Sequence, residues 1–339
     1  MFFRALLPLT TLAFLPLALS AAAPLTIKLK GGAQITGEVL KEKPDAVLVD
    51  LGFNVITVPR ADITEIVAEA GATGDAAPAA KQLAEDLFFT EANRDALAVD
   101  KNVSRVSESV VQIQTPGGLG SGFVINKLGH VVTNQHVIAG EQEIRVIMYR
   151  NKNSGIEKQT FNKVQILAMN GYLDLALLQI DDPSAPSLPH VVIGDSDGLG
   201  QGEAVFAIGS PLGLERTVSQ GIVSVKSREN QGRWYIQTTT QINPGNSGGP
   251  LFNSRGEVVG VTNMKIAGMG VEGVGFAIPA SLMKLFLKNR DAFAFDPKNP
   301  NNGFRYLAPP ELSAAAPSVP ASNDTKPSAS STPSTPATK

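Results

Sequence analysis

The chain has 339 residues, enough for more than one domain with a sizeable core. Its formal net charge is −2, so there is no basic excess that would indicate nucleic-acid binding. There is no cysteine, which excludes disulfides, cysteine metal sites, a cysteine nucleophile and a cysteine-linked lipid anchor.

The first residues predict a secretory signal peptide over residues 1–22. Arg4 is the only positive charge before a long apolar stretch, and small residues follow that stretch. Cleavage after Ser20 or Ala22 would release an exported protein, periplasmic or extracellular. An uncleaved membrane anchor is the alternative, although the stretch is short for a bilayer span and two prolines interrupt it. No later segment is long and apolar enough to form a transmembrane span.

Residues 25–70 predict a small β domain. Apolar and polar residues alternate in several short runs, beginning with Leu25, Ile27 and Leu29. Four or five short strands in a segment of this length predict an SH3-like or Sm-like barrel. Such a domain could bind a peptide, a glycan or another subunit, or it could serve only as a structural cap.

Residues 71–100 predict a linker followed by a helix. Residues 71–80 are rich in Ala and Gly, as in flexible linkers. The apolar residues of Lys81–Asp100 roughly follow a helical stripe. This helix would pack on its own domain or take part in docking or oligomerisation.

Residues 101–292 predict an antiparallel double barrel, because short apolar runs recur at short intervals with no long helical pattern between them. The predicted strands are Val110–Ile113, Phe123–Ile125, Val131–Val132, Ile144–Met148, Val164–Met169, Ala176–Ile180, Ala204–Ile208, Ile222–Val225, Tyr235–Thr238, Val258–Asn263 and Gly275–Ile278. A closing helix is predicted over Ser281–Lys288. His130 is placed in a turn and His190 in an exposed loop. Residues 297–339, dominated by Ala, Ser, Pro and Thr, predict a disordered tail.

The run Gln241–Pro250 places Ser247 between glycines and is too rich in Gly, Asn and Pro for a helix or a plain strand. Glycine permits a tight turn that aims backbone N–H groups at one point. If Ser247 is a nucleophile, the N–H groups of Gly245 and Ser247, with Asn246 as a third donor, would form an oxyanion hole. One such donor contributes about 3–4 kcal/mol of transition-state stabilisation. A glycine-rich turn without a catalytic role is the alternative.

A base and an acid precede this serine. His136 follows an apolar strand, and Asp174 is a lone carboxylate inside an apolar run, where it is costly to bury unless it is paired. The order His136, Asp174, Ser247 is that of chymotrypsin-type proteases. An α/β-hydrolase needs its histidine after the serine, and none follows Ser247. The subtilisin order needs an aspartate before the histidine on an α/β chain, which the strand-rich pattern disfavours.

At these residues the chain resembles the HtrA (DegP-like) family of trypsin-fold serine proteases. The matching segments fall in the family's order over roughly residues 103–288. They are Gly120–Ile125, Thr133–Ile138, Asp174–Leu178, Gly209–Gly213, Ser219–Ser224, Gly245–Pro250 and Gly275–Pro279. The resemblance implies a chymotrypsin-like fold of two six-stranded β-barrels with the triad between them. It also implies unfolded polypeptide substrates, a possible homotrimer, and no metal or organic cofactor. The chain departs from the family in having no recognisable PDZ domain.

Residues around the motif predict substrate contacts. By their position, Gln241 and Ile242 should lie near the base of the primary pocket, and Met264 and Lys265 beside the substrate chain. The resemblance places Asn263 near Asp174. Because no carboxylate stands at Gln241, we expect an apolar residue before the cleaved bond rather than Lys or Arg.

The sequence as a whole predicts an exported serine endopeptidase that cleaves unfolded or misfolded proteins through an acyl-enzyme, in protein quality control of the cell envelope. The alternative is a chaperone-like or adaptor binding protein that keeps the protease fold with little turnover. The added β domain and the missing PDZ domain are the features that favour this alternative.

Overall fold

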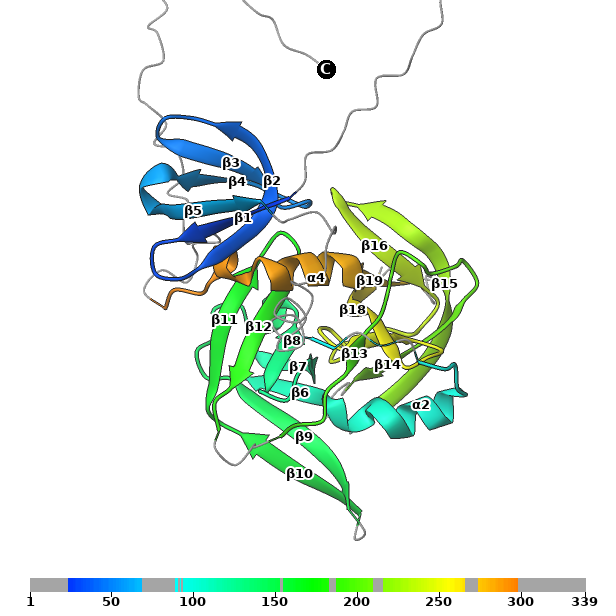
Figure 1. The fold of residues 1–339 in the computed structure, drawn as a ribbon. Coiled ribbons are helices and arrows are strands. Elements are labelled where there is room, and N and C mark those ends of the chain that lie inside the picture. The colour runs from blue at the N-terminus through cyan, green and yellow to red at the C-terminus, as the bar shows by residue number, and fades with distance from the viewer. Residues whose placement is uncertain are drawn as a thin grey trace, which may run out of the picture. The chain divides into compact units, whose positions relative to one another are not determined.

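The computed structural model describes residues 24–68, 89–90, 92, 94–152, 155–182, 187–209, 216–265 and 274–297 (Figure 1). All of them belong to one compact unit within Met1–Leu307. The predicted signal peptide, the linker at 71–80 and the tail beyond Pro297 lie outside the described residues. No helix among the described residues is long and apolar enough to cross a membrane.

The N-terminal strands form a five-stranded antiparallel sheet in the order β4-β3-β2-β1-β5. Alternate side chains such as Ile27, Val47 and Val49 are fully buried, so the sheet has one apolar inner face. The assignment as an SH3-like or Sm-like barrel stays a prediction. The elements are β1 (Leu25–Leu29), β2 (Gln34–Glu42), β3 (Ala46–Asp50), β4 (Val55–Pro59), the 3-10 turn η1 (Arg60–Asp62) and β5 (Ile63–Ala68).

The first barrel is built from a seven-stranded sheet in the order β10-β9-β6-β7-β8-β12-β11. Its elements are α2 (Val99–Val106), η2 (Ser107–Ser109), β6 (Val110–Thr115), β7 (Gly118–Val124), β8 (His130–Thr133), α3 (Gln135–Ile138), β9 (Arg145–Lys152), β10 (Gly155–Phe161), β11 (Val164–Asn170) and β12 (Leu175–Ile180). The sequence predicted six strands here. The seventh, β10, was not predicted because most of its side chains are exposed, which leaves no alternating apolar pattern.

The second barrel has six strands in the order β18-β17-β14-β15-β16-β19 and is closed by pairing of β18 with β19. The short strand β13 adds to β18 in parallel. The elements are β13 (Val192–Ile193), β14 (Ala204–Gly209), β15 (Thr217–Asn230), β16 (Arg233–Thr238), β17 (Pro250–Asn253), β18 (Glu257–Lys265), β19 (Gly275–Pro279), α4 (Ala280–Lys288) and η4 (Arg290–Phe293). This architecture confirms the predicted all-β class and the predicted closing helix.

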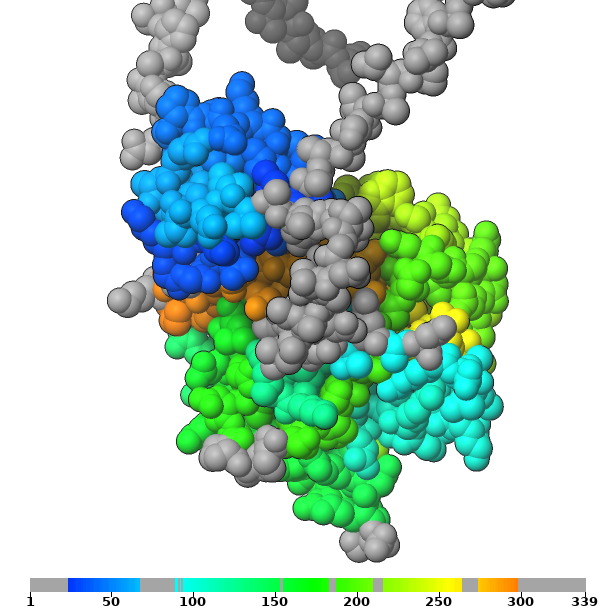
Figure 2. Space-filling model, viewed as in Figure 1, coloured from blue at the N-terminus to red at the C-terminus, as the bar shows by residue number. Residues whose placement is uncertain are grey.

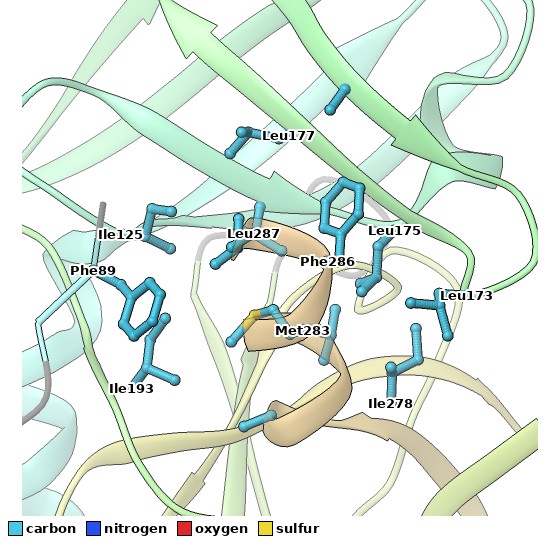
Figure 3. Packing of buried hydrophobic residues seen from close by; sticks show 14 of the residues in the cluster. Phe89, Ile125, Leu173, Leu175, Leu177, Ile193, Ile278, Met283, Phe286 and Leu287 are labelled. Carbon is cyan, nitrogen blue, oxygen red and sulfur yellow. The ribbon is translucent and has the colours of Figure 1, made fainter. Parts of the chain in front are cut away.

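Helix α4 lies at the centre of the largest hydrophobic cluster. Met283, Phe286 and Leu287 are fully buried; Phe286 lies beside Leu175 of the first barrel, and Met283 points toward Ile193 of β13, which pairs with the second barrel (Figure 3). Burying a side chain of this size contributes about 1.5–3 kcal/mol. Helix α4 therefore holds the two barrels together, so that residues of both barrels keep fixed positions relative to one another.

The N-terminal sheet packs against the same C-terminal segment. The N–H groups of Gln34 and Thr36 in β2 donate to Asp291 Oδ2 at 3.0 Å and to Asn289 Oδ1 at 2.9 Å. In Figure 2 the orange residues of this segment are seen against the blue sheet. Side-chain oxygens thus satisfy N–H groups of β2, and the sheet shares one core with the barrels.

The helix predicted over Lys81–Asp100 is wrong for the part that is described. Helix α2 begins only at Val99, and residues 94–98 are not helical. Thr90 instead forms an isolated parallel bridge with Val192, and Leu97 donates its N–H to the carbonyl of Ser254. Tertiary contacts with the second barrel therefore override the local helical pattern. Residues 81–88 lie outside the described residues.

Two histidines also differ from their predicted positions. His130, predicted in a turn, is the first residue of β8 and is only 8% exposed. Its Nδ1 lies 3.1 Å from Asn126 Oδ1. His190, predicted as exposed, is half-buried, and its Nδ1 lies 3.3 Å from the carbonyl of Leu188.

Candidate active site

The three residues of the predicted triad come from three separate elements. His136 lies in the single helical turn α3 after β8, Asp174 in the turn before β12, and Ser247 in the loop between β16 and β17. Strands β8 and β12 are antiparallel neighbours, with Thr133 opposite Ala176. Because the end of β8 faces the start of β12, the residues that follow β8 and precede β12 are brought together.

Asp174 contacts His136 through both carboxylate oxygens. His136 Nδ1 lies 2.6 Å from Asp174 Oδ2, and the His136 N–H donates to Oδ1 at 2.9 Å. Asn263 Nδ2 donates to Oδ2 at 2.5 Å. Asp174 is only 8% exposed, and a carboxylate this buried needs such donors. With the carboxylate as acceptor, Nδ1 carries the imidazole proton and Nε2 is left to act as a base.

The backbone of Asp174 is held in an unusual conformation. Its φ is 56°, in the left-handed region, which costs an aspartate about 1–2 kcal/mol. Its carbonyl accepts hydrogen bonds from Asn134 Nδ2 at 2.8 Å and from the N–H of Gln135 at 3.2 Å. The two residues before His136 therefore fix the backbone of its acidic partner. No local sequence pattern pointed to this role of Asn134.

Ser247 Oγ is hydrogen-bonded away from His136 in this structure. The Oγ donates to the backbone carbonyl of Asn263 at 3.0 Å, and within the described part of the chain no hydrogen bond joins it to His136. The side chain of His136 is about half exposed. Catalytic hydrogen bonds are often unformed without substrate, so this geometry is compatible with a nucleophile and its base.

The turn around Ser247 presents two backbone donors. Gly245 has a φ of 101°, which glycine adopts readily. The Asn246 N–H is already used, because it donates to the carbonyl of Asn243 at 2.9 Å. The N–H groups of Gly245 and Ser247 make no hydrogen bond to another described residue. Of the three donors predicted for an oxyanion hole, two are therefore available and the third stabilises the turn.

Ser121 ties this turn to the first barrel. It is fully buried, and its Oγ donates to the carbonyl of Gly245 at 2.6 Å. Its N–H donates to the carbonyl of Ser247 at 2.8 Å, and its own carbonyl accepts from Thr133 Oγ1 at 2.7 Å. No local sequence signal pointed to the hydroxyl of Ser121.

The predicted substrate-binding residues lie in different environments. Gln241 is exposed, and its carbonyl accepts from Ser219 Oγ at 2.9 Å. Ile242 is only 4% exposed and packs in the core of the second barrel. Met264 and Lys265 continue β18, where they pair with residues of β19. Among the described residues no group of three His, Asp or Glu side chains could hold a metal ion.

Comparisons with known proteins identify the same region. A family profile for a trypsin-like peptidase domain matches residues 120–261. A probable periplasmic serine endoprotease, DegP-like, from Pseudomonas fulva is 42% identical over 184 residues, which are 50% of this chain and 36% of that protein. A serine protease Do-like HtrA from Bacillus subtilis is 41% identical over 183 residues, 50% of this chain and 38% of that protein.

Among solved structures, an HtrA-type protease AlgW with tripeptide has a TM-score of 0.49 and 33% identity, covering 56% of this chain and 64% of that chain. The chain spans little more than a third of the length of the two curated relatives. Over this peptidase region, the chain is similar to serine proteases of the HtrA (DegP-like) family.

Proposed function

We propose that this protein is a serine endopeptidase that hydrolyses polypeptides with the triad Ser247, His136 and Asp174. The observation that carries the proposal is the contact of both Asp174 carboxylate oxygens with His136, at 2.6 and 2.9 Å. Such a contact fixes the orientation and tautomer of an imidazole and stabilises its protonated form. It is the arrangement that a general base beside a serine nucleophile requires.

The chemistry begins with rotation of Ser247 Oγ from the Asn263 carbonyl toward His136 Nε2. The hydroxyl attacks the peptide carbonyl while His136 takes its proton, and His136 then passes the proton to the leaving amine. The N–H groups of Gly245 and Ser247 hold the negative charge on the tetrahedral oxygen. Water activated by His136 hydrolyses the acyl-enzyme and regenerates the serine.

The proposal extends to the whole chain. Residues 1–22 direct export to the periplasm or the cell exterior, residues 25–70 form an accessory β domain, and residues 71–100 connect it to a protease domain over residues 101–292. Residues 297–339 form a tail. Relatives named as periplasmic serine endoproteases support export. A role in protein quality control, with unfolded polypeptides as substrates, follows from the resemblance to the family. A homotrimer follows only from the resemblance to the family.

One observation favours a second candidate, a binding protein with little turnover. In this structure Ser247 donates to a backbone carbonyl and not to His136, so the nucleophile is not paired with its base. A protein kept in this state would hold unfolded chains without cleaving them.

Digestion of casein by the mature chain, beside its Ser247→Ala variant, tests the proposed function. We expect cleavage by the wild type and a rate lower by about 10⁴-fold or more for the variant. Equal cleavage by both proteins would contradict the role of Ser247. If neither cleaves, failure of a fluorophosphonate to label Ser247 would favour the binding protein, whereas labelling would show that the nucleophile is competent.

A further inference from the structure

A cavity of about 390 Å³ lies between the N-terminal sheet and the two barrels. Three turns line it: the β3–β4 turn of the N-terminal sheet, the turn before β12 in the first barrel, and the tip of the β15–β16 hairpin in the second. None of the triad residues is among its lining residues. The cavity is therefore a second concave site, of the size that small ligands and single side chains occupy.

Large apolar and aromatic side chains form part of the walls of this cavity, beside polar groups. Trp234 is 54% exposed, Val55 is 48% exposed and Tyr172 is 47% exposed, although each belongs to a different turn or strand end. Single exposed apolar residues are normal on a protein surface, but three large ones around one cavity indicate a binding site. The base is formed by buried side chains, among them Leu173 and Ile278, which lie side by side in Figure 3.

The charged side chains that line the cavity are one of each sign. Asp50 supplies one carboxylate, whose Oδ1 accepts from the N–H of Gly52 at 2.7 Å. Arg233 supplies one guanidinium, placed over the ring of Tyr172 at 5.6 Å. One negative and one positive group favour an uncharged ligand that has both hydrogen-bond donors and acceptors. An extended polypeptide with an apolar side chain meets this requirement, because its N–H and C=O groups can face Asp50 and Arg233.

The cavity is also close to the triad along the chain. Tyr172 precedes Asp174 by two residues, so their Cα atoms are at most about 7 Å apart. The hydroxyl of Tyr172 donates to the carbonyl of Gly232 at 2.7 Å, which fixes this turn to the β15–β16 hairpin. A polypeptide that enters the cavity therefore comes near the catalytic aspartate.

We propose that this cavity binds one large apolar side chain of an extended polypeptide and thereby gives the substrate a second point of attachment outside the triad. This inference rests on the proposed function, since it names a recognition element of the substrate. It also gives the N-terminal sheet a role, because residues 50–55 form one wall of the site.

The chain carries its own reporter for a binding test, because Trp234 is its only tryptophan. The full chain with Ser247→Ala, which leaves the cavity unchanged, is titrated with an unstructured tryptophan-free peptide that contains phenylalanine. The control peptide carries serine in place of phenylalanine. We expect a saturable change in tryptophan emission with the first peptide and none with the second. Equal binding of both peptides, or no saturable change with either, overturns the proposal.

Two substitutions locate the binding. Val55→Asp, in the Ser247→Ala background, places a charge on the apolar wall and should raise the dissociation constant at least about tenfold. Ile156→Asp is the matched control, since Ile156 is an equally exposed apolar residue of β10, outside the cavity. Val55→Ser provides a milder variant if the aspartate disturbs folding, which far-ultraviolet circular dichroism reports. Unchanged binding in the folded Val55 variants, or loss of binding in Ile156→Asp, overturns the proposal.

This binding test and the casein test can fail independently. The titration uses a protein without its nucleophile, so it does not depend on hydrolysis. Casein cleavage without peptide binding to Trp234 would refute the second attachment point and leave the endopeptidase intact. Peptide binding without casein cleavage and without fluorophosphonate labelling of Ser247 would refute the endopeptidase alone. In an active enzyme, Val55→Asp should raise KM for casein and leave kcat unchanged.

Discussion

Asn263 contacts Ser247 through its backbone carbonyl, at 3.0 Å, while its side chain donates to Asp174 at 2.5 Å. Asn263 of β18 thus contacts both the proposed nucleophile and the proposed acid. The side-chain contact orients the acid, whereas the backbone contact holds the nucleophile away from its base. Activation then requires the Ser247 hydroxyl to leave this carbonyl, while the contact to Asp174 persists.

Replacing Asn263 should therefore lower turnover through Asp174. Asn263→Ala removes a hydrogen bond to a buried carboxylate, a contact worth about 1.5–3 kcal/mol. We expect kcat on a peptide substrate to fall by about tenfold to hundredfold. Asn263→Asp places a second carboxylate beside Asp174 and should lower kcat further. If both folded variants keep the wild-type kcat, the side chain of Asn263 does not position the acid.

Ser121 should act as a positioning residue for the loop that carries Ser247. Ser121→Ala leaves the carbonyl of Gly245 without its donor in a fully buried place, at a cost of about 1–3 kcal/mol. We expect kcat to fall by about tenfold or more with KM nearly unchanged, because the loop orients donors that act in the transition state. Ser104→Ala is the control, since Ser104 Oγ makes an exposed bond to a helix carbonyl. Equal kcat in both variants would contradict the role of Ser121.

The core of the site was predictable because its residues carry strong local signals. Asp174 is a lone carboxylate in an apolar run, and His136 follows the strand that pairs beside it. Burial without a partner would be costly there, so the pairing followed from physical chemistry. Ser121 and Asn134 gave no comparable signal, because they act on backbone carbonyls that only the folded chain brings within reach.

The strands and helices of the fold likewise differ in how well the sequence predicts them. Buried strands such as β12 and β14 are predictable from their apolar runs. Their predicted bounds lie within a residue or two of the observed ones. Strand β17 is short and wholly buried, and β10 is almost wholly exposed. Neither therefore has the alternation of apolar and polar residues that predicts a strand. The apolar residues around segment 94–98 have helical spacing, but the segment is not helical. Its backbone is instead hydrogen-bonded to the second barrel, where the Leu97 N–H donates to the carbonyl of Ser254.

Gly248 should tolerate no side chain. Its φ is 83°, and an added Cβ would lie 2.4 Å from the carbonyl oxygen of Ser121. Gly248→Ala should therefore combine a backbone cost of about 1 kcal/mol with about 1–3 kcal/mol of overpacking and displace the adjacent Ser247. We expect lower stability to urea and strongly reduced casein cleavage.

Gly202→Ala separates these two effects. Gly202 has a similar φ of 87°, but nothing lies within 4 Å of an added Cβ. This variant should lose about 1 kcal/mol of stability and keep full activity. If Gly248→Ala loses no more stability and activity than Gly202→Ala, the close approach of Gly248 to Ser121 is not required.

His130 should make stability depend on pH. Burial, with a smaller contribution from Arg290, lowers the pKa of His130 to about 4. The unfolded chain, with a histidine pKa of about 6.5, binds more protons than the folded chain between these values. Stability is therefore complete above about pH 6.5 and falls as the pH decreases toward 4, by up to about 3 kcal/mol.

Urea unfolding of the wild type and of His130→Asn at pH 7.5 and pH 5 measures this dependence. We expect the wild type to lose more stability than the variant between the two pH values, because asparagine does not titrate. His190→Asn is the control for removal of a histidine elsewhere, and it should keep the wild-type dependence on pH. A dependence that is the same in His130→Asn and in the wild type would assign the acid sensitivity to other groups, since only the His130 contribution is removed.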